Sequence, residues 1–525
     1  MNKNIFSKRI KKQNIKKRKI LSFLILTTIS LSIIGFVGIT HNMQNKSYFK
    51  ALSSSEWAPN GTTICTSEGN QLNTQLISDG NGGAIITWVD ERNPLSEEDI
   101  YAQKINSEGE TLWEHNGTII CNNEDRQISP QIVSDDSGGA IIVWYDNRAG
   151  NWDIYAQRVN SAGVVQWNTN GTIVCNKTST QNMPEAIKDG EGGAIITWYD
   201  DRNGNNDIYV QRIDSNGDLQ WDINGIVICD NQKEQSLPQI TSDGEGGAII
   251  TWRDNRTENY DIYAQKINSN GQTQWSSNGT LICNDNSIQV YPQLISDGLG
   301  GAIICWYNYF NGDSDIYAQR VNSAGVVQWE DNGTIICNAL DRQEGSQITS
   351  DGEGGAIISW EDLRSGDFDV YAQKITSTGV IQWDVNGTVI CNATDKQDGV
   401  HLTSDGEGGA IITWFDERNT DSDIYAQRVN SAGEIQWNTN GNLTCNALND
   451  QTSPRIIRSS AGKAIIAWRD TRNGNMDIYA ELISYSIETL DGGGNGGIPG
   501  FNPLILGIIS IITLIIAQNY KRKRN

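Results

Sequence analysis

Five side chains in the stretch GGAIITWYDDRNGNNDIY are of types that carry out chemistry: Trp198, Asp200, Arg202, Asp207 and Tyr209. Two carboxylates that bracket a loop of Asn and Gly residues can bind Ca²⁺, which prefers oxygen ligands. The spacing is not that of an EF-hand, and an arginine lies between the two acids. We therefore expect Arg202 to pair with both aspartates and to hold the hairpin together. The sequence predicts no cofactor, with Ca²⁺ as the one alternative.

This stretch is repeated eight times, which argues against a single active site. Its tryptophan recurs at Trp88, Trp144, Trp198, Trp252, Trp306, Trp360, Trp414 and Trp468. A second series with the same spacing is Trp57, Trp113, Trp167, Trp221, Trp275, Trp329, Trp383 and Trp437. An active site needs particular acids, bases and nucleophiles with different pKa values. The conspicuous Arg, Tyr and Asp residues all belong to the repeat, and His115 and His401 occupy unrelated positions in it, so we predict no catalytic residues.

Each repeat of about 54 residues predicts four β-strands. MPEAIKD and AIITWYD flank a Gly-rich turn, DIYVQRI alternates apolar and polar residues, and a last strand ends at Cys229. Eight four-stranded sheets in tandem are typical of a β-propeller. The chain begins its repeats with a lone fourth strand, Trp57 to Cys65, and ends them after a third strand, Asp477 to Leu482. We therefore predict an all-β, eight-bladed propeller over residues 57–485, closed by the N-terminal strand.

The order of these elements resembles the repeat of sialidase-type propellers, which carry Asp-box turns. The resemblance rests on the apolar strand, the Trp-x-Asp, the Asp-Ile-Tyr strand and a Ser-x-Gly turn such as Ser215-Asn216-Gly217 before Trp221. It covers all eight units and implies a propeller fold. In that family, hydrolysis uses an arginine cluster, a tyrosine nucleophile with an acidic partner, and an aspartate. No unique set of such residues stands out in this sequence.

The two ends of the chain are of a different composition. Residues 1–19 contain nine Lys and Arg and no acid, and they precede the apolar run Ile20–Ile39. We interpret 1–40 as a signal peptide or signal anchor and 41–56 as a linker. A Gly-rich linker at 486–500 leads to an apolar segment and a basic tail at 501–525, which we interpret as a transmembrane segment. The PGF motif there resembles archaeal surface-protein sorting tails.

Charge and cysteine content limit the partners. The chain has a formal net charge of −23 although both termini are basic, so the repeats are strongly acidic and nucleic acid is an unsuitable partner. Eight of the nine cysteines occupy one repeat position: Cys65, Cys121, Cys175, Cys229, Cys283, Cys337, Cys391 and Cys445. Equivalent positions in successive repeats are too far apart for their cysteines to form a disulfide bond. We expect these cysteines to be buried and unpaired thiols. We also expect the protein to be a monomer.

Sequence variation is concentrated in two loops, one between the second and third strands and one after the cysteine. Loops on a rigid scaffold commonly carry binding residues. Before the Asp-Ile/Val-Tyr strand, every second unit has a large apolar residue: Trp152, Tyr260, Phe368 and Met476. We predict that these four form a ligand-binding rim on one face. Unit five differs in another way, because Asn308 and Phe310 replace its Asp and Arg.

Six units also contain an Asn-Gly-Thr motif, beginning at Asn60, Asn116, Asn170, Asn278, Asn332 and Asn386. Asn-Gly forms tight turns, and Asn-x-Thr is a glycosylation acceptor on exported proteins. The sequence as a whole predicts a membrane-anchored propeller on the outer face of the cell, which binds a protein or glycan ligand. A sialidase-like glycan hydrolase is the alternative.

Overall fold

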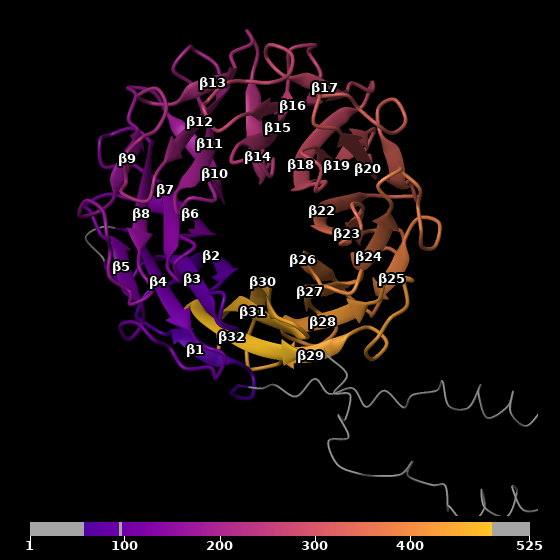
Figure 1. Cartoon of the computed structure of the whole chain (residues 1–525). Helices are drawn as coiled ribbons and strands as arrows, with labels where there is room; N and C mark the ends of the chain where they lie inside the picture. The colour runs from indigo at the N-terminus through magenta and orange to yellow at the C-terminus, as the bar shows by residue number, and fades with distance from the viewer. Residues whose placement is uncertain (1–56, 94–96, 486–525) are drawn as a thin grey trace, which may run out of the picture. The chain divides into compact units, whose positions relative to one another are not determined.

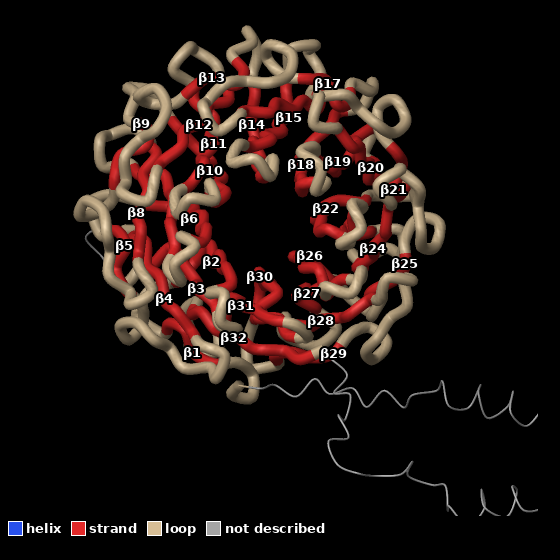
Figure 2. Tube along the Cα trace, viewed as in Figure 1, coloured by secondary structure: helices blue, strands red, loops and turns tan. Residues whose placement is uncertain are grey.

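The computed structural model describes residues 57–93 and 97–485, and this part of the chain forms eight blades around a central opening (Figure 1). Its 32 strands form eight four-stranded antiparallel sheets. Only strands and loops occur in this part of the chain (Figure 2). The predicted all-β, eight-bladed propeller is therefore confirmed.

The predicted segments at 1–40, 41–56, 486–500 and 501–525 lie outside the described residues. Within the ring itself, no helix is long and apolar enough to cross a membrane.

Each blade places its strands from the central opening outwards in chain order. The innermost strands are β2 (Gln71–Ser78), β6 (Gln127–Ser134), β10 (Gln181–Lys188), β14 (Gln235–Ser242), β18 (Ile288–Ser296), β22 (Gln343–Ser350), β26 (Gln397–Ser404) and β30 (Gln451–Ser460). The second strands are β3 (Ala84–Asp90), β7 (Ala140–Asp146), β11 (Ala194–Asp200), β15 (Ala248–Asp254), β19 (Ala302–Phe310), β23 (Ala356–Asp362), β27 (Ala410–Asp416) and β31 (Lys463–Asp470).

The outer half of each blade is built from the third strand and a short fourth strand of four residues. The third strands are β4 (Asp99–Ile105), β8 (Asp153–Val159), β12 (Asp207–Ile213), β16 (Asp261–Ile267), β20 (Asp313–Val321), β24 (Asp369–Ile375), β28 (Asp423–Val429) and β32 (Asp477–Ser484). The fourth strands are β5 (Thr118–Cys121), β9 (Thr172–Cys175), β13 (Ile226–Cys229), β17 (Thr280–Cys283), β21 (Thr334–Cys337), β25 (Thr388–Cys391), β29 (Asn442–Cys445) and, for blade 8, β1 (Thr62–Cys65).

The hydrophobic core lies between neighbouring blades. The second strand of a blade, such as β3, is buried along its whole length because sheets cover both of its faces. Its tryptophan, Trp88 in blade 1, has no exposed surface and packs with Tyr101 at 6.4 Å between ring centroids. A buried Trp removes about 150–250 Å² from water, so one such residue per blade supplies much of the driving force for blade packing.

The N-terminal strand closes the ring, as the sequence predicts. Strand β1 pairs antiparallel with β32, with Thr62 opposite Ala480. The Trp57 amide donates to Glu481 Oε1 at 3.2 Å, as the Trp113 amide donates to Gln103 Oε1 in blade 1. Blade 8 therefore completes itself with a strand from the other end of the described chain, and no sheet is left with an open edge at the closure.

A half-buried arginine joins each of seven blades to its neighbour. In blade 1, Arg92 Nε donates to Asp90 Oδ1 at 2.8 Å, and Nη2 donates to the Asn116 carbonyl at 2.8 Å. The same Nη2 lies 3.2 Å from Cys65 Sγ of the preceding blade, and the guanidinium stacks 3.8 Å above the Tyr101 ring. The other six pairs are Arg148–Asp146, Arg202–Asp200, Arg256–Asp254, Arg364–Asp362, Arg418–Asp416 and Arg472–Asp470.

This geometry corrects one expectation and confirms another. Arg202 pairs with Asp200 but does not bind Asp207, whose carboxylate accepts hydrogen bonds from Asn203 and Asn205 instead. All nine cysteines are buried and unpaired, as expected. Burial raises the pKa of each thiol to about 12, so the thiols stay protonated.

The turn role predicted for Asn-Gly is confirmed, whereas glycosylation stays a prediction. Asn116 and Gly117 have φ angles of 61° and 95°. A Cβ atom at Gly117 would lie 2.6 Å from the Trp88 ring, so this position accepts only glycine. The Asn116 side chain accepts a hydrogen bond from the Thr66 amide at 3.1 Å, across the joint between blades.

Ring closure by β1 gives a first testable prediction. A chain that begins at residue 67 should have a lower melting temperature than a matched chain that begins at residue 56. The shorter chain lacks buried Ile64 and Cys65 and leaves Arg472 without the Asn60 carbonyl, losses that we expect to cost at least about 3 kcal/mol. Equal melting temperatures in differential scanning calorimetry would contradict this closure.

Candidate functional site

A bulge in each innermost strand directs one side chain into the central opening. In β10 the pairing with β11 shifts between Asn182 and Glu185, and Met183 within that bulge has a φ of 49°. Positive φ is rare for a residue other than glycine and marks local strain. All eight innermost strands have the same register shift. Bulges commonly redirect a side chain next to a functional site, and here the first residue after each bulge lines the opening.

These eight side chains form the axial ring, and the repeat is broken within it. Blades 1, 2, 4, 5 and 6 contribute glutamines, which are Gln75, Gln131, Gln239, Gln293 and Gln347. The other three blades contribute Glu185, His401 and Arg455. The repeat therefore places three different ionisable groups at one position around the axis. This asymmetry is what a binding or catalytic site requires.

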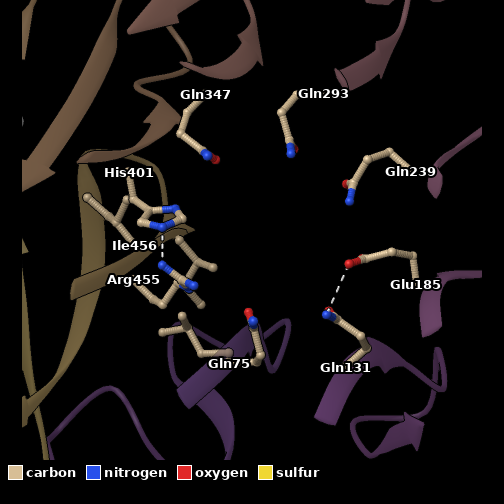
Figure 3. A pocket seen from close by; sticks show the side chains of 11 residues that line it. Gln75, Gln131, Glu185, Gln239, Gln293, Gln347, His401, Arg455 and Ile456 are labelled. Carbon is tan, nitrogen blue, oxygen red and sulfur yellow. Dashed lines mark hydrogen bonds between the residues drawn. The ribbon is translucent and has the colours of Figure 1, made fainter. Parts of the chain in front are cut away.

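The axial ring encloses a polar cavity of about 340 Å³ (Figure 3). The amides of five glutamines point inwards, and Leu76, Ile456 and Ile457 contribute its few apolar walls. The volume lies in the range of small-molecule sites. The site is therefore large enough for a single polar group or ring and is lined mainly by hydrogen-bonding groups.

His401 and Arg455, from adjacent blades 7 and 8, contact each other directly. An Arg455 Nη1 hydrogen faces His401 Nε2, so the neutral imidazole accepts and the guanidinium donates. Burial, and then the Arg455 charge, hold the pKa of His401 well below its usual value. Burial and the nearby charge of Arg469 lower the pKa of Arg455 to about 10, which leaves it positively charged at neutral pH.

Glu185 lies in blade 3, on the opposite side of the cavity from His401 (Figure 3). Its carboxylate accepts a hydrogen bond from Gln131 Nε2 at 3.2 Å. Burial raises the pKa of Glu185 to about 7, although hydrogen bonding to Gln239 and the charge of Arg455 act in the opposite direction. The three ionisable groups are enclosed by protein but keep some contact with water through the opening. Near neutral pH, Glu185 is therefore present in both protonation states.

Together these groups can bind a polar ligand that carries a negative charge. Arg455 supplies a fixed positive charge and charge-assisted hydrogen bonds. Each glutamine offers both a donor and an acceptor, which matches the hydrogen bonding of a hydroxyl group. Protonated Glu185 can donate to the ligand, and ionised Glu185 would repel an anion.

The sequence analysis missed this site. His401 was assigned to an unrelated repeat position, and Glu185 and Arg455 were not singled out. The signal was available, because each axial residue lies four positions before the Asp or Ser that opens the first turn of its unit, as in Gln75 before Asp79. Alignment of the eight units on that turn would have placed all eight residues in one column. The structure therefore brings together three ionisable residues that the sequence analysis did not single out.

The four predicted rim residues occupy alternate blades and are half-buried. Trp152 packs edge-on against Tyr145 at 4.9 Å between centroids. Tyr260 lies under Arg253 at 4.4 Å, and its hydroxyl donates to Glu234 Oε2 at 3.0 Å. Phe368 lies 5.5 Å from the Arg342 guanidinium carbon. The structure therefore does not bring the rim residues together, and their role in ligand binding stays a prediction.

The backbone at the rim positions has a structural role that the sequence did not indicate. The carbonyls of Trp152, Tyr260, Phe368 and Met476 accept a hydrogen bond from the first glutamine amide of the next blade. Within residues 57–93 and 97–485, no group of three or more His, Cys, Asp and Glu side chains is arranged to hold a metal ion.

Comparison with known proteins finds similarity of fold. No protein-family model matches the chain, and no curated protein matches it. A polysaccharide lyase of family PL25, an ulvan lyase, is 12% identical and has a TM-score of 0.45, with 73% of this chain and 97% of that chain covered. The α-L-arabinanase of Penicillium chrysogenum, solved with arabinobiose, is 11% identical, with a TM-score of 0.34 and coverage of 58% and 93%.

A protein of unknown function from Dyadobacter fermentans DSM 18053 is 10% identical. Its TM-score is 0.37, with 70% of this chain and 98% of that chain covered. At these identities the similarity concerns the fold alone.

The raised pKa of Glu185 gives a second prediction. The folded state keeps the Glu185 proton up to about pH 7, whereas an unfolded chain releases it near 4.5. The free energy of unfolding therefore decreases as pH rises from about 4.5 through 7. The variant Glu185→Gln should match the wild type near pH 4 and exceed it at pH 8 by up to about 3 kcal/mol, with water in the opening reducing this value.

Denaturant unfolding at pH 4, 6 and 8 measures this effect. Glu68→Gln, at an exposed position, is the matched control and should leave the pH dependence unchanged. An identical pH dependence for Glu185→Gln and the wild type would show that Glu185 ionises as an ordinary surface carboxyl.

Proposed function

We propose that this propeller binds a glycan in the cavity of the axial ring and that a carboxylate of the glycan contacts Arg455. One observation carries the proposal: a polar cavity on the axis is lined by five glutamines, and the repeat is broken there by an arginine, a histidine and a glutamate. A polar lining suits a ligand rich in hydroxyl groups better than an apolar protein side chain. Among the glycan and protein ligands that the sequence left open, a glycan is therefore favoured.

Arg455 supports an acidic glycan in particular. The repeats are strongly acidic, so an anionic ligand would be repelled from most of the surface. Inside the cavity, the Arg455 guanidinium offsets that repulsion at one point, and His401 holds it in place through the Nη1–Nε2 contact. A glycan carboxylate that enters the cavity can form paired hydrogen bonds with the guanidinium. The hydroxyl groups of the same glycan can bond to the glutamine amides.

Hydrolysis of a bound glycan is the alternative function. A carboxyl group with a pKa of about 7, as Glu185 has, is suited to act as a general acid. Most glycosidases place a second carboxyl group on the other side of the scissile bond. Among the described residues that line this cavity, Glu185 supplies the one carboxyl group, so binding is the function that we propose.

We further propose that the propeller faces the outside of the cell and is held at the membrane by residues 501–525. The support comes from the apolar run that precedes the basic tail Lys521–Arg524 and from the basic, then apolar, N-terminal segment at 1–40. A glycan ligand is consistent with that location, because glycans are abundant on cell surfaces and in the extracellular medium.

Replacement of Arg455 gives the third prediction. The variant Arg455→Gln restores the residue that five other blades have, so it changes the charge of the site and conserves its amide lining. Binding of uronate-containing oligosaccharides should weaken by about 10- to 100-fold, which corresponds to roughly 1.5–3 kcal/mol for a hydrogen-bonded charge. Binding of neutral oligosaccharides of equal length should be little affected.

A glycan array followed by calorimetric titration measures these affinities. Lys188→Gln, which removes an exposed positive charge outside the axial ring, is the matched control. If Arg455→Gln and the wild type bind acidic oligosaccharides equally, the proposed site is wrong. Release of reducing ends from a bound oligosaccharide, lost in Glu185→Gln, would establish hydrolysis instead.

The predicted rim gives the fourth prediction. If Trp152 and Tyr260 contact the ligand beyond the cavity, the double variant Trp152→Ser/Tyr260→Ser should bind longer oligosaccharides less tightly and shorter ones as before. The melting temperature should change little, because both side chains are half-buried. A large loss of stability with unchanged binding would assign both residues to packing alone.

A further inference from the structure

Seven blades hold an arginine of the chain in one recurring site, which we call the arginine cradle. In blade 4 it consists of the Asp254 carboxylate, the Asn278 carbonyl, Cys229 Sγ and the face of the Tyr263 ring, which together surround Arg256. Guanidinium carbons lie 3.7–4.0 Å from the tyrosine centroids in all seven blades. The cradle is thus a guanidinium site demonstrated seven times within the molecule.

Blade 5 keeps the tyrosine of the cradle, Tyr317, but has no arginine at the equivalent position. Asn308 replaces the aspartate and still accepts the indole hydrogen of Trp306, with Nε1 to Oδ1 at 2.8 Å. Phe310 replaces the arginine, and 60% of its side-chain surface is exposed. Instead of lying over Tyr317, the phenyl ring faces solvent.

The exchange also changes the hairpin of blade 5. Strands β19 and β20 continue to the pair Phe310–Asp313, and Asn311-Gly312 form a two-residue turn with φ angles of 53° and 93°. In blade 4 the corresponding pairing stops at Asp254–Asp261. The longer hairpin is particular to this blade, and Phe310 at its end lines a cavity together with Asn308 and Tyr317.

A cavity of about 310 Å³ lies in blade 5 against Asn308 and Tyr317, which stand where the aspartate and tyrosine of the cradle stand in the other blades. Asp285, Asp313 and Asp315 line it together with Asn308 and Tyr317, and its lining includes no Lys or Arg. In the other seven blades, the tyrosine equivalent to Tyr317 is 5–8% exposed and the aspartate equivalent to Asp315 at most 4% exposed. Here both are half-buried, so a carboxylate and an aromatic face are open to the cavity.

We propose that the blade 5 cradle binds a guanidinium group from outside the chain, the side chain of an arginine. The residue types that hold guanidinium groups in seven sister blades recur here around a cavity, with Asp315 and Asp313 supplying the charge that Asp254 supplies in blade 4. A cation can stack on the open face of Tyr317, and Phe310 and Tyr309, 60% and 43% exposed, can contact residues next to that arginine. This inference does not rest on the proposed glycan site.

Calorimetric titration of the full-length protein tests the proposal with three probes: acetyl-arginine amide, acetyl-citrulline amide and acetyl-lysine amide. Citrulline has the shape of arginine without its charge, and lysine has the charge without the planar donors. We expect binding of the arginine probe with one site per chain and at least tenfold weaker binding of the other two. Stronger binding of acetyl-Gly-Arg-Gly amide would indicate an arginine within a polypeptide, and equal binding an arginine side chain alone.

Two variants separate the cradle from nonspecific attraction to an acidic protein. The double variant Asn308→Asp/Phe310→Arg rebuilds the sequence of the other blades, so its own arginine should fill the cradle, weaken probe binding at least tenfold and raise the melting temperature. Asn308→Asp alone supplies the aspartate of the other blades without an arginine to pair with it, and it should bind the arginine probe at least as tightly as the wild type. Binding should also weaken from pH 7.5 to pH 5, because burial raises the pKa of Asp315 to about 6.

Three results would overturn the proposal: no binding of the arginine probe by the wild type, equal binding of the citrulline probe, or unchanged binding by the rebuilt double variant. A folded Asn308→Asp variant that fails to bind the arginine probe would likewise count against the cradle as the site.

Discussion

One half-buried guanidinium at seven of the eight joints between blades holds most of this ring together. Removal of a carboxylate from water costs several kcal/mol unless the charge is paired and its lone pairs are used. Asp90 meets that condition, because it accepts from the Trp88 indole at 2.7 Å and from the Arg92 side chain and amide. The same arginine reaches the last strand of the preceding blade through Cys65 Sγ. Packing of the tryptophan, pairing of the hairpin and contact between blades therefore depend on one another.

This dependence explains the strict repetition of the sequence. A change of Asp, Arg, Trp or Tyr in one blade would leave a buried polar group without its partner, and such groups are costly. The closure follows the same rule, because Asn60 supplies to Arg472 the carbonyl that Asn116 supplies to Arg92. Blade 5 departs from the rule by a paired exchange: Asn308 carries no charge, and Phe310 needs no partner.

The sequence of the repeat can vary at positions that take no part in the arginine contacts between blades. At the axis, each side chain projects from a bulge into the central opening, where Gln131 bonds to Glu185 and Arg455 to His401 of a neighbouring blade, so its identity is not fixed by its own blade. The axial ring thus accommodates Glu185, His401 and Arg455 among five glutamines. A symmetric scaffold obtains an asymmetric cavity from three substitutions at one position.

The sequence by itself determined the fold. Tryptophan spacing, alternating strands and the offset of one strand between the first and last units predict eight closed blades, because those signals are local and occur eight times. It also determined that the cysteines are unpaired, since equivalent positions in a ring cannot meet. Its interpretation of the conspicuous repeated residues as structural agrees with the Arg–Asp–Tyr contacts at the joints.

Only the tertiary structure decided where an asymmetric site lies. Glu185, His401 and Arg455 are separated by 216 and 54 positions in the chain, and each is an ordinary polar residue within its own strand. They meet because the ring brings the same position of every blade to one axis, and because a bulge turns that position inwards. Their altered pKa values arise from this enclosure and from mutual contact, so no pattern within a single repeat could reveal them. The predicted rim, in contrast, had a visible alternation in sequence, but the ring keeps its four members on separate blades.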